Sequence, residues 1–112
     1  MSRRTEKVAA LLHKEAGEYL SLLELSGLTT ISKVEVTPDL KWGKVWVTIM
    51  GSVAVQRQTL GEIVEQLPEF QHGLIRKLKM KIVPRVSFVL DHGEEYAAHI
   101  NELLKKTHDD EQ

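Results

Sequence analysis

Apolar residues along the first quarter of the chain follow a helical period. Between Thr5 and Leu25 they recur every three or four residues, which predicts a helix. Its buried stripe comprises Val8, Leu11, Leu12, Tyr19, Leu22 and Leu23. Ser26-Gly27 ends the pattern, and Gly27 is expected to follow the helix in a left-handed conformation.

Two alternating segments follow and predict a pair of strands. From Thr29 to Thr37, one face carries Ser32, Val34 and Val36, and the other carries Ile31, Lys33 and Glu35. From Lys41 to Met50, one face carries Val45, Val47 and Ile49, and the other carries Trp42, Lys44, Trp46 and Thr48. The short Pro38-Asp39 connection predicts an antiparallel hairpin, with Asp39 serving the turn.

The middle of the chain returns to a helical period, but the period is interrupted. A helix is predicted from Val53 to Leu67, and a capping-box pattern beginning at Thr59 places its well-formed part from about Leu60. Its apolar side comprises Leu60, Ile63, Val64 and Leu67. Pro68 removes a helix hydrogen bond, and Gly73 costs about 1 kcal/mol relative to alanine in a helix interior. We therefore expect two helical pieces that meet at an angle.

The segment from Phe70 to Asp91 combines half a helix with a strand. Phe70, Leu74, Ile75 and Leu78 predict an apolar stripe, while His72, Arg76 and Lys79 fall on the opposite side. The following residues alternate as in a strand, with Ile82, Val86, Phe88 and Leu90 on one face and Val83, Arg85, Ser87 and Val89 on the other. This segment predicts a core-bound helix with a cationic outer face that leads directly into a strand.

A turn at His92-Gly93 and a last helix complete the pattern. Asp91 is expected to cap this helix. Its acidic first turn and basic last turn suit the helix dipole, and its inward residues are Tyr96, Ile100, Leu103 and Leu104. The long helical connection between the second and third strands predicts a mixed, three-stranded sheet covered by helices, in the α+β class. We expect one domain over residues 1–106 and a flexible tail over 107–112.

Charge changes this picture locally. The formal net charge is −1, yet five of the fifteen basic residues lie between Arg76 and Arg85 with no acid among them. Such a patch can bind phosphate although the net charge of the chain is close to zero, because salt screens each charge beyond about 10 Å. The alternative is that these lysines and arginines merely solvate a helix face.

The sequence lacks the residues that several classes of function require. The chain has no cysteine, which excludes disulfides, thiolate nucleophiles and cysteine-based zinc sites and suits a reducing cytoplasm. The five histidines show no metal-ligand spacing. We find no nucleophile elbow, no phosphate-binding glycine loop and no paired carboxylates, so we predict no catalysis, metal or cofactor. No apolar run approaches a membrane span, and no secretory signal is present.

Three segments carry a family resemblance: Val36–Val47 around the hairpin, Gly73–Arg76 running into Leu78–Asp91, and Glu95–Leu104. Together they resemble the ribosome-binding factor A family, and the middle segment is the most specific. The resemblance implies a type II KH-like fold, in which a kink around an Ala-x-Gly motif replaces the usual loop between the central helices. Here Gln71-His72-Gly73 occupies that place.

The resemblance also implies a function. It implies a monomeric, non-enzymatic factor that binds 16S rRNA in free small (30S) ribosomal subunits or their precursors. Such a factor supports late maturation of the subunit, including processing of the rRNA 5′ end and growth in the cold.

The candidate RNA-binding residues are cationic or lie beside the expected kink. We predict contacts to the rRNA backbone from Arg76, Lys77, Lys79, Lys81 and Arg85. A second set, which could equally be solvated surface, comprises Arg3, Arg4, Lys7, Lys14, Lys41, Lys44, His72 and Gly73.

Trp42 and Trp46 share one strand face and leave two alternatives open. They could stack on bases or on a protein if the face is open, or they could pack as a lid over the sheet. Two rival hypotheses therefore remain: a protein-interaction module that uses this face, and a small α+β enzyme with an unrecognised site.

Overall fold

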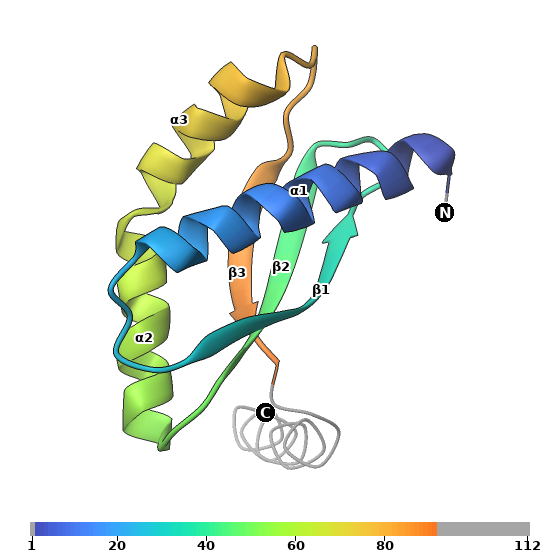
Figure 1. Cartoon of the computed structure of the whole chain (residues 1–112). Coiled ribbons are helices and arrows are strands. Elements are labelled where there is room, and N and C mark those ends of the chain that lie inside the picture. The colour runs from blue at the N-terminus through green and yellow to red at the C-terminus, as the bar shows by residue number, and fades with distance from the viewer. Residues whose placement is uncertain (1, 92–112) are drawn as a thin grey trace, which may run out of the picture.

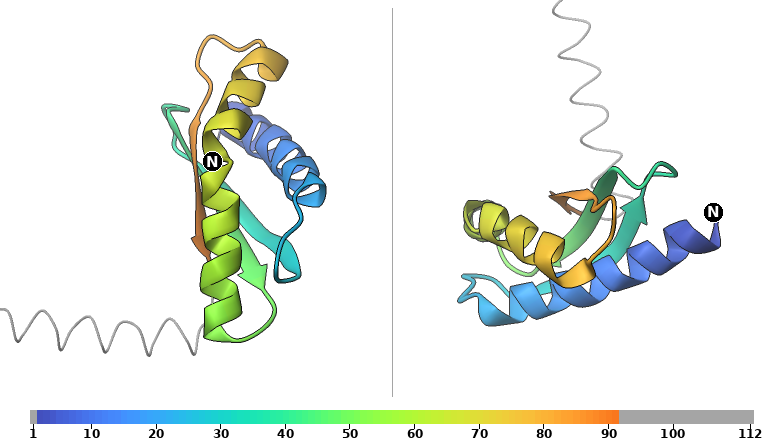
Figure 2. Two further views of the ribbon diagram at one scale, coloured as in Figure 1. Left: turned by 90° about the vertical axis from the view of Figure 1, so that its left-hand side faces the viewer. Right: turned by 90° about the horizontal axis from the view of Figure 1, so that it is seen from above.

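The helices and the sheet form two layers (Figure 1). The computed structural model describes residues 2–91. In chain order its elements are α1 Arg3–Leu22, β1 Thr29–Val36, β2 Trp42–Ile49, α2 Val53–Glu65, α3 Leu67–Leu78 and β3 Arg85–Leu90. Figure 2 shows α1 crossing one face of the sheet, with α2 and α3 along its β3 side. The predicted order and the α+β class are confirmed for this part of the chain.

The sheet is mixed, as predicted. Its strand order is β1-β2-β3, with β1 and β2 antiparallel and β2 and β3 parallel. In the hairpin turn, Asp39 Oδ1 accepts hydrogen bonds from the Thr37 hydroxyl (2.6 Å) and the Lys41 amide (3.0 Å). These bonds lower the pKa of Asp39, with the Thr37 bond contributing most. Asp39 therefore serves the turn, as the sequence predicted.

Strand β2 shows why one face of the sheet is covered. Val45, Val47 and Ile49 are buried in the core, whereas the alternate positions point to the other face. Gly43 belongs to the covered face, where an added Cβ would lie 2.7 Å from Leu12 Cδ2 of α1. The lack of a side chain at this position lets α1 approach the sheet closely.

Helix α1 is shorter than predicted. Its buried face comprises Thr5, Val8, Leu12, Ala16 and Leu20, which recur every three or four residues. The helix ends at Leu22, which is 84% exposed, so its predicted place in the buried stripe was wrong. Gly27 is likewise not the helix terminator. It is buried in the loop, where an added Cβ would meet Ile49 and Val55 side chains at 2.9 Å.

Strand β1 contains an irregularity that the alternation did not predict. The register with β2 shifts between Ile31 and Lys33, so that Ser32 is an extra residue. Ile31 therefore pairs with Val47 on the covered face, with Val34 and Val36 farther along. The alternation placed Ser32 on the face of Val34 and Val36 and Ile31 on the opposite face, and this was wrong: Ile31 shares the covered face, and Ser32 is exposed and hydrogen-bonds to the Thr48 hydroxyl (2.6 Å). The inserted residue reverses the alternation at the bulge.

Helix α2 begins earlier than the capping-box pattern indicated. Ser52 is its N-cap, and the Ser52 hydroxyl accepts a hydrogen bond from the Val55 amide (3.3 Å). Thr59 lies inside the helix, buried, and its hydroxyl donates to the Val55 carbonyl (2.7 Å). Ile63 is fully buried, but Val64 is exposed, so its predicted place on the apolar side was wrong.

The break between α2 and α3 lies at Gln66, not at Gly73. Pro68 occupies the first turn of α3, where its missing amide hydrogen costs no helix hydrogen bond. Gln71, His72 and Gly73 are all within α3, so the kink expected at this motif was wrong. The predicted contribution of Pro68 to the bend is confirmed.

The connection from α3 to β3 is longer than predicted. Lys79 ends α3 with a left-handed backbone (φ 46°), and β3 begins only at Arg85. Ile82 therefore lies in the connection, exposed, and does not share the buried face of Val86 and Phe88. Ile75 is also exposed, contrary to its predicted place in the stripe.

Some predictions fall outside the described residues. These are the turn at His92-Gly93, the last helix with its cap at Asp91, and the tail 107–112. Within residues 2–91, no helix has the length and apolar character to cross a bilayer.

Candidate nucleic-acid interface

An aromatic cluster fixes α3 against α1 and the sheet. The Tyr19 ring stacks on Phe70, with centroids 4.5 Å apart, and both rings contact Phe88 of β3. The Tyr19 hydroxyl donates to the Ile63 carbonyl (2.6 Å). Burial, followed by the nearby Glu69 carboxylate, raises the pKa of Tyr19 to about 12. These contacts hold the first half of α3 against α1 and β3.

Gln71 joins α3 to the start of β3. Its Nε2 donates to the Pro84 carbonyl (2.8 Å), and its Oε1 accepts from the Val86 amide (2.9 Å). The amide side chain thus pairs with a β-strand edge as a neighbouring strand would. The β3 end of the basic α3–β3 connection is therefore anchored to α3. Sequence reasoning missed this role, because it depends on how α3 faces β3.

Three segments far apart in the sequence meet at one end of the molecule. Figure 1 shows the N-terminal end of α1, the β1–β2 turn and the α3–β3 connection at the same end. A cavity of about 300 Å³ confirms part of this convergence, since Arg4 and Lys7 line it together with Lys81. We call this region the cationic end, and it comprises Arg3, Arg4, Lys7, Lys41, Arg76, Lys77, Lys79 and Lys81.

The cationic end is largely unneutralised by the protein itself. Two ion pairs occur within residues 2–91: Lys77 with Glu15 (3.2 Å) and Lys33 with Glu35 (3.2 Å). Of the predicted set, Lys77 therefore ties α3 to α1. The side chains of Arg76, Lys79 and Lys81 are exposed and belong to neither pair. Such a cluster of exposed like charges attracts anions.

The remaining predicted residues lie elsewhere. Lys44 and Arg85 lie on the face of the sheet opposite the buried one. His72 and Gly73 lie within α3, and an added Cβ at Gly73 would meet nothing within 4 Å. Lys14 is exposed on α1, beside a separate cavity that His13 also lines.

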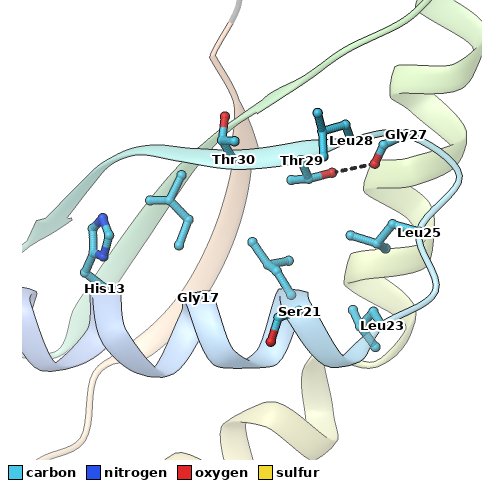
Figure 3. Close-up of a pocket in the computed structure, with 11 residues that line it drawn as sticks. His13, Gly17, Ser21, Leu23, Leu25, Gly27, Leu28, Thr29 and Thr30 are labelled. Carbon is cyan, nitrogen blue, oxygen red and sulfur yellow. Dashed lines mark hydrogen bonds between the residues drawn. The ribbon is translucent and has the colours of Figure 1, made fainter.

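Another cavity is unrelated to these cations. It has a volume of about 640 Å³ and lies between α1 and β1 (Figure 3). Leucines dominate its lining, with His13, Gly17 and Ser21 from α1. The dashed hydrogen bond in Figure 3 runs from the Thr29 hydroxyl to the Gly27 carbonyl (3.0 Å). No group of three potential metal ligands occurs in the described part of the chain.

Comparisons with known proteins agree with the arrangement of the elements. Residues 4–104 match the family model described as ribosome-binding factor A. The ribosome-binding factor A of Caldanaerobacter subterraneus subsp. tengcongensis is 33% identical, over 95% of this chain and 90% of its own length.

Two sets of coordinates share the fold. The crystal structure of ribosome-binding factor A from Thermus thermophilus superposes with a TM-score of 0.64 at 21% identity, covering 77% of this chain and 93% of its own. The homology model of Thermus thermophilus ribosome-binding factor A that was fitted into a cryo-EM map of a 30S–RbfA complex superposes with a TM-score of 0.61 at 21% identity. The match covers 74% of this chain and 90% of that one. The family match spans most of the chain and the fold agrees with it, so this chain belongs to the ribosome-binding factor A family.

Proposed function

We propose that this protein binds the small ribosomal subunit through 16S rRNA and supports its late maturation. The proposal includes a contribution to processing of the rRNA 5′ end and to growth in the cold. Its support is membership of a family named for ribosome binding, and the fold shared with a protein fitted into a map of a 30S–RbfA complex. In this proposal the chain acts in the cytoplasm as a monomer and without catalysis.

The observation that carries the proposal is the cationic end. The basic segments of α1, the hairpin turn and the α3–β3 connection lie at this one end, and Arg4, Lys7 and Lys81 line a common cavity there, although the net charge of the chain is −1. Phosphate groups of RNA are the anions that such a surface meets on a ribosomal subunit. Contacts to phosphates fix position and orientation without reading sequence.

Binding alone supplies a mechanism. A protein that prefers one arrangement of the rRNA shifts the population towards that arrangement by its difference in affinity. The anchored helix α3 suits this role, because a rigid surface discriminates between rRNA arrangements better than a mobile one. No covalent step is required.

Charge reversal at the cationic end tests the proposal. The variant Arg76→Glu with Lys79→Glu should reduce co-sedimentation with small subunits, mature and immature, by at least about tenfold, since each charge-assisted hydrogen bond contributes about 1.5–3 kcal/mol. Arg57→Glu, on the exposed surface of α2, is the matched control and should bind normally. Undiminished association of the double variant would contradict the proposal.

One observation favours a second candidate, a protein-interaction module. Trp42 is 57% exposed on the open face of the sheet, and exposed tryptophans are frequent anchors in protein interfaces. Under this candidate, Trp42→Ala would abolish association with the subunit, while the double charge reversal would not.

A further inference from the structure

The open face of the sheet places aromatic and cationic side chains in cross-strand rows. Trp42 of β2 pairs with Arg85 of β3, and one row away Lys44 pairs with Ser87. Successive rows on one face are about 7 Å apart, because residues two positions apart share a face. Arg85 is therefore the cross-strand neighbour of Trp42, and Lys44 lies one row farther along the same face.

The two tryptophans of this face have different surroundings. Trp46 is half-buried, and its ring is covered by the ammonium groups of Lys33 (4.6 Å from the centroid) and Lys44 (5.4 Å). Its Nε1 is buried and has no acceptor within residues 2–91. Trp46 is thus already occupied by the protein's own cations, whereas Trp42 presents its ring to solvent.

A cavity of about 490 Å³ adjoins Trp42. Trp42, Lys44, Arg85 and Ser87 line it, together with the hairpin residues Thr37 and Pro38. Glu35 is the acid in the lining, and its carboxylate is held by Lys33. The cavity therefore combines an exposed indole with polar hydroxyls and with the guanidinium of Arg85, which belongs to neither ion pair found within residues 2–91.

We propose that Trp42 stacks on an unpaired base of single-stranded RNA, while Arg85, its partner on β3, binds a phosphate next to that base. This inference rests on the proposed function, and it adds a second contact to the one made by the cationic end. Lys41, in the turn beside Trp42, continues the cationic end towards this face.

The chemistry favours RNA over a protein as the occupant. The centre of a protein interface is commonly apolar and is depleted in lysine and acidic residues, although arginine is enriched there. Here cations line the cavity beside the ring, which suits a polyanion. The RNA must be single-stranded at this point, because bases inside a duplex are stacked on each other and expose no face.

The test uses the purified full chain and a fluorescently labelled uridine decamer, with affinity read from anisotropy. Trp42→Leu should weaken binding by about fivefold or more, whereas Trp42→Phe, which keeps an aromatic face, should retain most of it. Arg85→Gln should weaken binding and flatten its salt dependence. Leu22→Ala, on an exposed leucine at the other end of α1, is the matched control and should change nothing. Unchanged thermal unfolding of Trp42→Leu shows that a loss of binding is not a loss of fold.

Two results would overturn the inference. One is equal affinity of Trp42→Leu and the unmodified chain for the decamer. The other is that Trp42→Leu weakens binding to an RNA duplex of the same length by the same factor as it weakens binding to the decamer. If Trp42→Leu loses subunit association yet binds the decamer normally, the face meets a protein and the inference is wrong. Failure of the cationic-end proposal is recognised separately, by normal subunit binding of the Arg76→Glu and Lys79→Glu variant.

Discussion

Gln71 is the residue whose role the sequence concealed most completely. The family resemblance placed Gln71 at a kink between helices, but α3 is continuous there. Its amide instead satisfies one carbonyl and one backbone N–H at the start of β3. A periodicity places Gln71 on a helix, but it cannot show that a strand edge lies opposite.

Removing this amide should loosen the start of β3. Gln71→Ala loses both hydrogen bonds, so we expect it to lower the free energy of unfolding by about 1–3 kcal/mol. Gln71→Glu keeps an acceptor for the Val86 amide but turns a carboxylate oxygen towards the Pro84 carbonyl, and two acceptors repel each other, so it should also lower stability. Chemical denaturation measures both, and faster hydrogen exchange of the Val86 amide should accompany the change. Equal stability of all three proteins would contradict the assigned role.

Tyr19 should make the free energy of unfolding fall as the pH rises in the alkaline range. The folded protein favours the neutral phenol, since burial raises its pKa to about 12. Stability from this group is fully present below the unfolded pKa near 10 and is lost as pH rises through about 12. Tyr19→Phe should lose about 0.5–1.5 kcal/mol at neutral pH through the missing bond to Ile63. Denaturation at pH 7 and pH 11 should show a smaller alkaline loss for Tyr19→Phe, and an identical loss would contradict this assignment.

At the scale of elements, prediction succeeded where local chemistry decides and failed where packing decides. The alternation of β2 gave its buried face, because every second residue of a regular strand must lie on the same side. The bulge in β1 could not be predicted from the sequence. Ser32 fits the alternating pattern, but in the structure it is an extra residue with no partner on β2. Helix α2 begins at Val53, as the predicted range had it, but the refinement to about Leu60 was wrong because Ser52, not Thr59, is the N-cap.

The end of α3 illustrates a conflict between stability and binding. Lys79 adopts a left-handed backbone, which costs a residue with a Cβ roughly 1 kcal/mol relative to glycine. Lys79→Gly should therefore raise the free energy of unfolding by about 1 kcal/mol while weakening association with the small subunit. Lys79→Asn tolerates the same backbone without the charge, so it should also weaken association. Thermal unfolding and co-sedimentation check both variants, and a Lys79→Gly protein with undiminished association would contradict the role of this cation.

At the scale of the whole molecule, the sequence predicted part of the cationic end. The basic run from Arg76 to Arg85 is contiguous, so its cationic character is visible without a structure. The neighbouring contributions of Arg4, Lys7 and Lys41 depend on how the segments meet, which no local pattern encodes. Lys77 shows the converse, because its pairing with Glu15 on a distant helix could not be read from the run itself.

The most direct test of the account is the salt dependence of small-subunit binding. The logarithm of the association constant should fall linearly with the logarithm of salt concentration, because binding releases counterions from phosphates. Arg76→Gln with Lys81→Gln removes two such contacts and should reduce the magnitude of the slope by about 1.4–1.8. A slope near zero for the unmodified protein, or the same slope for the double variant, would contradict phosphate binding at the cationic end.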